Sequence, residues 1–310
     1  MAAVHAADAT RYPDPEYCQL KKALAALHQV DAHRVIMAAS ASEFITRFTV
    51  VSHRLAPGSV AVARHSYGDY QNAARAIGRA VVCLEAGATT GATLRWYGDP
   101  TSPLGQSCDP PPTETAWPPG VGVLDMAYAP LRLDGSTAWT RSQMDAVFTL
   151  HSPNKALGLT GVRGAYAIAP NVPRALEWIN ALNAACPSWP IGAHGVAMLA
   201  AWCELSTHAW LADSLQQLRL WRKMQIDMLR KLGTVVMPSV SNFFCVTPPV
   251  SVSAAALRCF DIKVRDTASF GLPNMQRLSV QPPRAQEALR CALTEILSVD
   301  TKPHAKQASH

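Results

Sequence analysis

The stretch from Thr149 to Tyr166 holds a lysine among residues that suit a phosphate-bearing aldehyde cofactor. Lys155 can form an imine with an aldehyde if it is held in place and kept partly unprotonated. Ser152 and Arg163 flank it, and a hydroxyl together with a planar fork of N–H donors suits a phosphate. An exposed lysine in a glycine-rich turn would give the same local pattern, so other motifs have to decide between the two.

This stretch, which includes SPNKALGLTGVR, resembles the cofactor-binding segment of class I/II aminotransferases. That segment runs Ser/Thr, two residues, Lys and then GLxGxR, and the histidinol-phosphate aminotransferase and threonine-phosphate decarboxylase branch is most similar. The resemblance implies that Lys155 carries pyridoxal 5'-phosphate (PLP) as a Schiff base and that Ser152 and Arg163 bind its phosphate. Asn154 stands where the family often has Ser, so one hydroxyl contact to the phosphate is lost or replaced by an amide.

Two further motifs follow predicted strands. LDMAY, ending at Tyr128, is similar to the family's Asp-Glu-Ala-Tyr, which implies that Asp125 pairs with the pyridine nitrogen and that Tyr128 bonds the 3′ oxygen. A carboxylate there keeps that nitrogen protonated and makes the ring an electron sink. HSYGDY resembles Pro-Thr-Tyr-x-x-Tyr and implies that Tyr67 stacks on the ring. ASASEF matches a strand-to-helix turn whose backbone N–H groups bind phosphate, here those of Ala41 and Ser42.

The remaining motifs concern the substrate and a second subunit. RYPDPEY resembles an Arg-Tyr-Pro segment, which implies that Tyr12 reaches the phosphate of a neighbouring subunit in a homodimer with shared active sites. VRDTASFGLPNMQRLSV resembles the family's C-terminal pair of arginines. It implies that Arg277 binds the substrate α-carboxylate and that Arg265 approaches the distal group. In DPTSPLG, Ser102 replaces the asparagine that contacts the 3′ oxygen.

Strand-like and helix-like segments alternate along the chain, which predicts an α/β protein with a mainly parallel central sheet flanked by helices. The resemblance implies the PLP-transferase fold type I with a smaller α+β C-terminal domain. We expect a short N-terminal segment (1–30), a large PLP-binding domain (31–205) and a small domain (206–310). The predicted strands of the large domain are 34–38, 59–64, 80–84, 121–125, 146–150 and 165–169, and those of the small domain are 235–237, 243–246 and 277–280.

Composition excludes several classes of protein. The mean hydropathy is near zero, and the chain lacks both an apolar run of membrane-spanning length and a signal-peptide pattern, so we expect a cytoplasmic protein without a membrane partner. The net charge of +6 is spread out, and the most basic segment, 218–231, predicts an amphipathic helix with a solvated basic face rather than a nucleic-acid site. The eight cysteines lack metal-ligand spacing and are expected to be reduced core residues.

Three functions fit these motifs. The first is an aminotransferase acting on a small-molecule amino acid, with a phosphate or another anionic group on its side chain. The second is a decarboxylase similar to the threonine-phosphate decarboxylase of cobalamin biosynthesis, which would use the same residues to break a different bond. The third is a degenerate PLP-binding protein without activity, suggested by Ser102 and by the short stretch ahead of Arg11.

Overall fold

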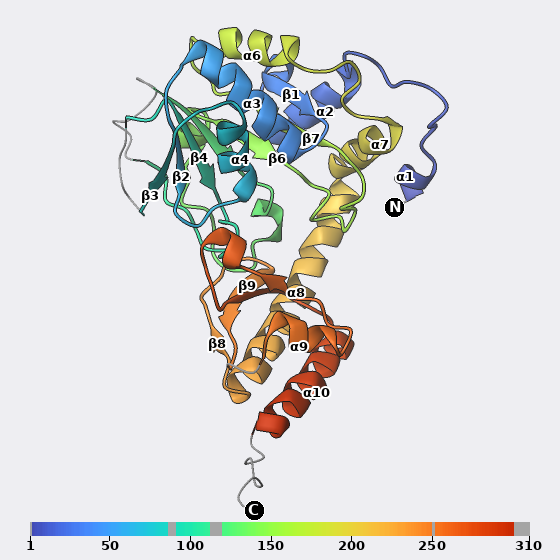
Figure 1. Ribbon diagram of the computed structural model, residues 1–310. Helices are drawn as coiled ribbons and strands as arrows, with labels where there is room; N and C mark the ends of the chain where they lie inside the picture. Colours follow the sequence, from blue (N-terminus) through green and yellow to red (C-terminus); the bar gives the residue numbers. More distant parts are fainter. Residues whose placement is uncertain (1, 86–90, 112–119, 250–251, 301–310) are drawn as a thin grey trace, which may run out of the picture.

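The computed structural model describes residues 2–85, 91–111, 120–249 and 252–300, which form a larger and a smaller lobe (Figure 1). Seven strands form the sheet of the larger lobe, in the order β1-β7-β6-β5-β4-β2-β3. β2 to β6 run parallel to one another, and β7 is antiparallel to both β6 and β1. The strands are β1 (Val35–Ala38), β2 (Val60–Ala63), β3 (Val81–Leu84), β4 (Leu94–Gly98), β5 (Val121–Asp125), β6 (Phe148–His151) and β7 (Ala165–Ile168).

Helices cover both faces of this sheet. Because alternate residues of a strand point to opposite sides, each strand contributes side chains to two cores. Ile36 and Ala38 of β1 pack into one core with the helices α3 (Ala41–Leu55), α4 (Gly68–Ala76) and α6 (Ala175–Ala184). Val35 and Met37 pack into a second core with α2 (Cys18–His28) and α7 (Ala193–Trp202). Two short helices, α1 (Ala2–His5) and α5 (Arg141–Met144), complete the lobe.

One central strand, β4, was not predicted from the sequence. β4 pairs with β2 on one side and with β5 on the other, and its Leu94 and Trp96 are buried. The segment reads LRWYG, and its arginine and glycine weaken the apolar signal of a buried strand. The other six predicted strands of the large domain are present within one or two residues of their expected ends.

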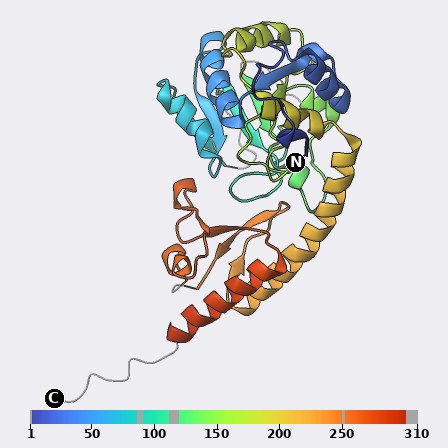
Figure 2. The same ribbon diagram turned by 90° about the vertical axis from the view of Figure 1, so that its right-hand side faces the viewer.

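The smaller lobe contains an antiparallel sheet in the order β10-β11-β9-β8, covered by helices. Its elements are β8 (Val235–Val236), β9 (Phe243–Thr247), α9 (Ala254–Arg258), β10 (Arg265–Asp266), β11 (Gln276–Ser279) and α10 (Pro283–Asp300). The long helix α8 (Leu205–Lys231) joins the lobes, and it lies beside α10 at its far end (Figure 2). Leu211 of α8 packs in the core of the larger lobe, and Leu229 packs in that of the smaller one. The domain boundary at residue 205 stays a prediction.

Two expectations need correction. The basic face of α8 is only partly solvated, because Arg219 donates to the carbonyl of Leu133 at 2.6 Å and Arg222 pairs with Asp134. The cysteines are free, but four of them are exposed rather than in the core, namely Cys18, Cys83, Cys259 and Cys291. Within the described residues, no helix is both long and apolar enough to cross a membrane. Nor does that part of the chain gather three or more side chains suited to bind a metal ion.

Candidate active site

Asp125 ends β5, and its carboxylate is fixed in a buried position. Tyr70 Oη donates to Asp125 Oδ2 at 2.7 Å, and the Ala127 N–H donates to Oδ1 at 2.9 Å. Burial raises the pKa of Asp125, while both hydrogen bonds and the charge of Lys155 act in the opposite direction. The ring of Tyr70 is stacked on Trp96 of β4, with 4.8 Å between centroids. Tyr70 is the second tyrosine of the HSYGDY motif, and sequence reasoning did not single it out.

Lys155 lies in the loop after β6 and is half-buried. Its Nζ is 5.4 Å from the ring centroid of Tyr128, which is also half-buried. Burial lowers the pKa of Lys155, the nearby Asp125 raises it, and the charges of Arg163 and Arg277 lower it further. The structure therefore brings these charged side chains within electrostatic reach of one amine. A lowered pKa increases the fraction of neutral amine, which is the form that attacks an aldehyde.

The loop around Lys155 is braced by a side chain whose role the sequence did not reveal. Ser152 Oγ donates to Asn154 Oδ1 at 2.9 Å, and Asn154 Nδ2 donates to the carbonyl of Val162 at 3.3 Å. Ser152 and Asn154 are buried, whereas Arg163 is exposed. The amide of Asn154 thus joins the two ends of the loop, and it also holds the hydroxyl predicted to bind phosphate.

The N-terminus of α3, which the sequence predicts to bind phosphate, is in contact with Tyr67. Ser40 caps the helix, since its Oγ accepts a hydrogen bond from the Glu43 N–H at 3.1 Å. Ala41 and Ser42 are the first two helical residues, where N–H groups lie ahead of the helical hydrogen-bond ladder. Ser42 Oγ is 3.2 Å from Tyr67 Oη, so the predicted phosphate site and the predicted stacking residue are in direct contact.

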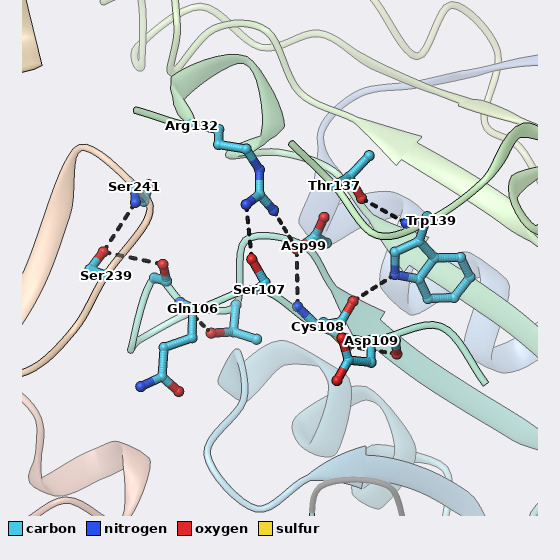
Figure 3. Close-up of polar contacts among 12 residues, drawn as sticks. Asp99, Gln106, Ser107, Cys108, Asp109, Arg132, Thr137, Trp139, Ser239 and Ser241 are labelled. Carbon is cyan, nitrogen blue, oxygen red and sulfur yellow. Dashed lines mark hydrogen bonds and ion pairs between the residues drawn. The ribbon is translucent and has the colours of Figure 1, made fainter. Parts of the chain in front are cut away.

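The turn that carries Ser102 is anchored by an ion pair in the interior. Arg132 Nη2 lies 2.6 Å from Asp99 Oδ1, and the two side chains are 9% and 1% exposed. Arg132 Nη1 also donates to Ser107 Oγ at 2.9 Å, and the Cys108 N–H donates to Asp99 Oδ1 at 3.0 Å (Figure 3). Arg132 therefore connects the two ends of this turn. It belongs to no motif noted in the sequence.

Both predicted substrate arginines lie on one face of the smaller sheet. Arg265 of β10 is directly opposite Arg277 of β11, and directly opposite residues of antiparallel strands point to the same side. Arg277 Nη1 donates to Ser102 Oγ at 3.3 Å, and its guanidinium lies 4.9 Å from the ring centroid of Phe243. Arg265 is exposed, and its guanidinium lies 5.4 Å from the ring centroid of Phe270. The sequence did not reveal this shared face.

Tyr12 lies in the N-terminal segment and is 78% exposed. Its ring stacks on that of Trp189, with 4.6 Å between centroids. The role predicted for it in a neighbouring subunit stays a prediction.

The assembled side chains fit PLP chemically. A lysine amine with a lowered pKa, a buried carboxylate, a tyrosine ring and a helix N-terminus offer partners for an aldehyde, a pyridine nitrogen, an aromatic ring and a phosphate. Asp125 keeps the capacity to accept further hydrogen bonds, since each carboxylate oxygen has two lone pairs.

Known proteins resemble this chain over most of its length. A family model described as "Aminotransferase class I and II" matches residues 96–296. The histidinol-phosphate aminotransferase of Jannaschia sp. (strain CCS1) is 25% identical, over 94% of this chain and 85% of its own length. The solved histidinol-phosphate aminotransferase from Clostridium acetobutylicum has a TM-score of 0.78 at 18% identity and covers 94% of this chain and 92% of its own.

The histidinol-phosphate aminotransferase from Sinorhizobium meliloti was solved in complex with pyridoxal-5'-phosphate. It has a TM-score of 0.74 at 19% identity, over 96% of this chain and 86% of its own. At such identities the likeness shows the fold, and it confirms the predicted α/β architecture of PLP-transferase fold type I.

Proposed function

Since this chain belongs to the aminotransferase class I and II family, we propose that it moves an amino group from an amino acid with an anionic side chain, with Lys155 as the residue that binds PLP. The family match confirms the predicted enzyme class and the predicted cofactor, PLP. The observation that best supports the assignment of Lys155 is its half-buried amine with a lowered pKa, placed within electrostatic reach of the buried Asp125.

Each residue of the larger lobe then has a distinct task. When bound, PLP withdraws electrons from the bonds at the substrate α-carbon. Asp125 holds a proton on the pyridine nitrogen, and Tyr70 fixes the carboxylate that does so. Once the substrate amine has displaced it from the cofactor, Lys155 Nζ would take the proton from the substrate α-carbon and give it to the former aldehyde carbon of the cofactor, on the far side of the imine nitrogen, as a general base and then a general acid. Tyr128, whose ring lies 5.4 Å from this amine, would donate to the 3′ oxygen of the cofactor.

The substrate is proposed to lie between Lys155 of the larger lobe and the two arginines of the smaller lobe. Arg277 offers a planar fork that suits an α-carboxylate, and Ser102 orients it. Arg265 points to the same side of the sheet and suits a second anionic group. The curated relatives are named histidinol-phosphate aminotransferases, so histidinol phosphate, a phosphate-bearing amine without an α-carboxylate, should be tested beside L-glutamate.

We also propose a homodimer with shared active sites. Tyr12 supports this idea, because a tyrosine that is 78% exposed in one chain is free to contact a second copy. Sedimentation equilibrium should give twice the mass of one chain. Tyr12→Phe should weaken PLP retention on dialysis without changing that mass.

Spectroscopy and product analysis test the proposal together. Protein loaded with PLP should show the visible band of a lysine-bound cofactor, and L-glutamate should bleach it. Lys155→Ala should abolish both the band and keto-acid formation with 2-oxoglutarate, while Lys223→Ala, which changes an exposed lysine of α8, should leave them unchanged. Release of CO₂ from L-threonine phosphate would favour the decarboxylase instead. A band that persists in Lys155→Ala would contradict the central assignment.

A further inference from the structure

A hydrogen bond joins the two lobes beside the site. Its two residues lie within motifs described above, but the resemblance gave neither of them a role. His65 follows β2 in the larger lobe, and its Nδ1 lies 2.9 Å from the carbonyl oxygen of Phe270 in the smaller lobe. A carbonyl oxygen only accepts, so Nδ1 must carry the proton and donate. Gly271, at φ +73°, lets the backbone turn here, and a Cβ at that position would lie 3.6 Å from Nδ1, an ordinary van der Waals contact.

On each side of this bond stands a residue proposed to bind cofactor or substrate. Tyr67 is two residues beyond His65 and is in contact with Ser42 at the N-terminus of α3. On the other side, the guanidinium of Arg265 lies over the ring of Phe270. These contacts, together with the backbone from His65 to Tyr67, therefore link the proposed phosphate site to the proposed distal-group arginine through this bond.

The small-lobe segment on this path is held together by internal hydrogen bonds. Thr267 is fully buried, and its Oγ1 lies 2.8 Å from the carbonyl oxygens of both Leu272 and Met275. Asp266 Oδ1 also accepts the Ala268 N–H at 2.7 Å. Because these bonds tie the segment together, the hydrogen bond from His65 at its tip can set how the whole segment sits against the larger lobe.

We propose that His65 is a positioning residue that docks segment 267–272, and with it Arg265, onto the loop that carries Tyr67. This inference rests on the proposed function, because the quantity it controls is the affinity for an amino donor with an anionic side chain. His65 does not take part in the chemistry itself. Loss of its hydrogen bond changes KM and leaves kcat intact.

Three substitutions separate the hydrogen bond from the bulk of the ring. The amide nitrogen of Asn can occupy the place of Nδ1, whereas that of Gln reaches the place of Nε2. We expect His65→Ala and His65→Gln to raise KM for the anionic donor about two- to fivefold, the lower range for the loss of one neutral hydrogen bond and no more than the loss of Arg265 itself. His65→Asn should restore KM to within twofold of wild type. In all three variants, kcat and the visible cofactor band should stay within twofold.

The tautomer of His65 gives a readout that does not depend on activity. In protein labelled with ¹⁵N-histidine, NMR should show a ring protonated at Nδ1, assigned by its disappearance in His65→Asn. A ring protonated only at Nε2 would overturn the proposal, and so would a His65→Gln enzyme with the KM of His65→Asn. If the proposed reaction fails altogether, the tautomer still decides whether the docking bond exists.

Discussion

Asp125 and Arg265 stand in the two halves of the proposed site, and they are held in different ways. The carboxylate of Asp125 is buried at the end of a central strand and is fixed by Tyr70 and by the Ala127 N–H. The guanidinium of Arg265 is exposed on the edge strand β10 and touches the ring of Phe270. The half built for the cofactor is thus part of the core, whereas the half built for the substrate depends on how the smaller lobe sits.

The comparison predicts where substitutions damage stability, where they damage chemistry and where they change affinity. In the larger lobe the side chains are interlocked, so a change there should be costly. In the smaller lobe the arginines are partly solvated, and water screens their charges.

The largest effect should follow the loss of Arg132. Arg132→Met leaves the carboxylate of Asp99 buried and unpaired, which should reduce the free energy of unfolding by about 3–5 kcal/mol. Urea unfolding of the holoenzyme measures this. The double variant Asp99→Asn/Arg132→Met should recover much of the loss, because it removes the buried charge. A single variant as stable as wild type would show that the turn is not anchored by this pair.

Asp125→Asn should keep the fold and lose the chemistry. Tyr70 can still donate to the amide oxygen, but the charge that holds a proton on the pyridine nitrogen is gone, so kcat should fall on the order of 10²- to 10³-fold. Single-turnover rates with L-glutamate measure this. Tyr70→Phe removes only the bond that orients the carboxylate and should cost about tenfold. Equal losses in the two variants would contradict the separate roles.

The larger half should also lose stability in acid, through a half-buried imidazole. His28 Nε2 lies 2.7 Å from Tyr166 Oη, and burial lowers the pKa of His28 from 6.5 to about 4. Below pH 6.5, His28 is protonated in the unfolded chain, whereas in the folded chain it stays neutral until about pH 4. The free energy of unfolding therefore decreases as the pH falls through that window. The expected loss from His28 is on the order of 2 kcal/mol between pH 7 and pH 5.

Urea unfolding at the two pH values measures the loss. His28→Gln, whose amide can still reach Tyr166, should reduce the pH dependence, and the part due to the neighbouring His151, whose pKa burial also lowers, should remain. The exposed control His33→Gln should retain the full dependence. An unchanged slope in His28→Gln would assign the acid sensitivity to other groups.

Arg277→Lys tests the junction of the two halves. The lysine keeps the charge but loses the fork and the bond to Ser102, so kcat/KM for L-glutamate should fall about tenfold, the equivalent of 1.4 kcal/mol. Most of the loss should appear in KM. Arg284→Lys, at an exposed position of α10, serves as the matched control. A loss confined to kcat would place Arg277 in the chemistry rather than in binding.

The same division explains what the sequence could predict. Asp125 and Lys155 stand in contiguous motifs at strand ends, where a local pattern is enough to place them on one edge of a parallel sheet. The pairing of Arg265 with Arg277 depends on the register of two strands, which a short and partly exposed hairpin does not specify in its residue pattern.

Long-range partners are equally hidden in the sequence. The ion pair of Asp99 with Arg132 joins residues 33 positions apart, and the bond of His65 to Phe270 joins residues 205 apart. Neither follows from periodicity or spacing, because tertiary packing alone brings these residues together. Strand β4 was missed for a different reason, since its arginine packs over Tyr97 and still allows a buried strand.

The smallest effect is expected at Arg265, the exposed member of the pair Asp125 and Arg265. Because its guanidinium is exposed, Arg265→Gln should raise KM for a donor with an anionic side chain only about two- to fivefold. The increase should shrink at high salt, since screening already weakens the wild-type contact, and a donor with a neutral side chain should be unaffected. Steady-state kinetics at two ionic strengths measure this, with the exposed Arg258→Gln as control. A loss of kcat, or a salt-independent effect on both donors, would mean that Arg265 supports the packing of the smaller lobe and does not bind the distal group.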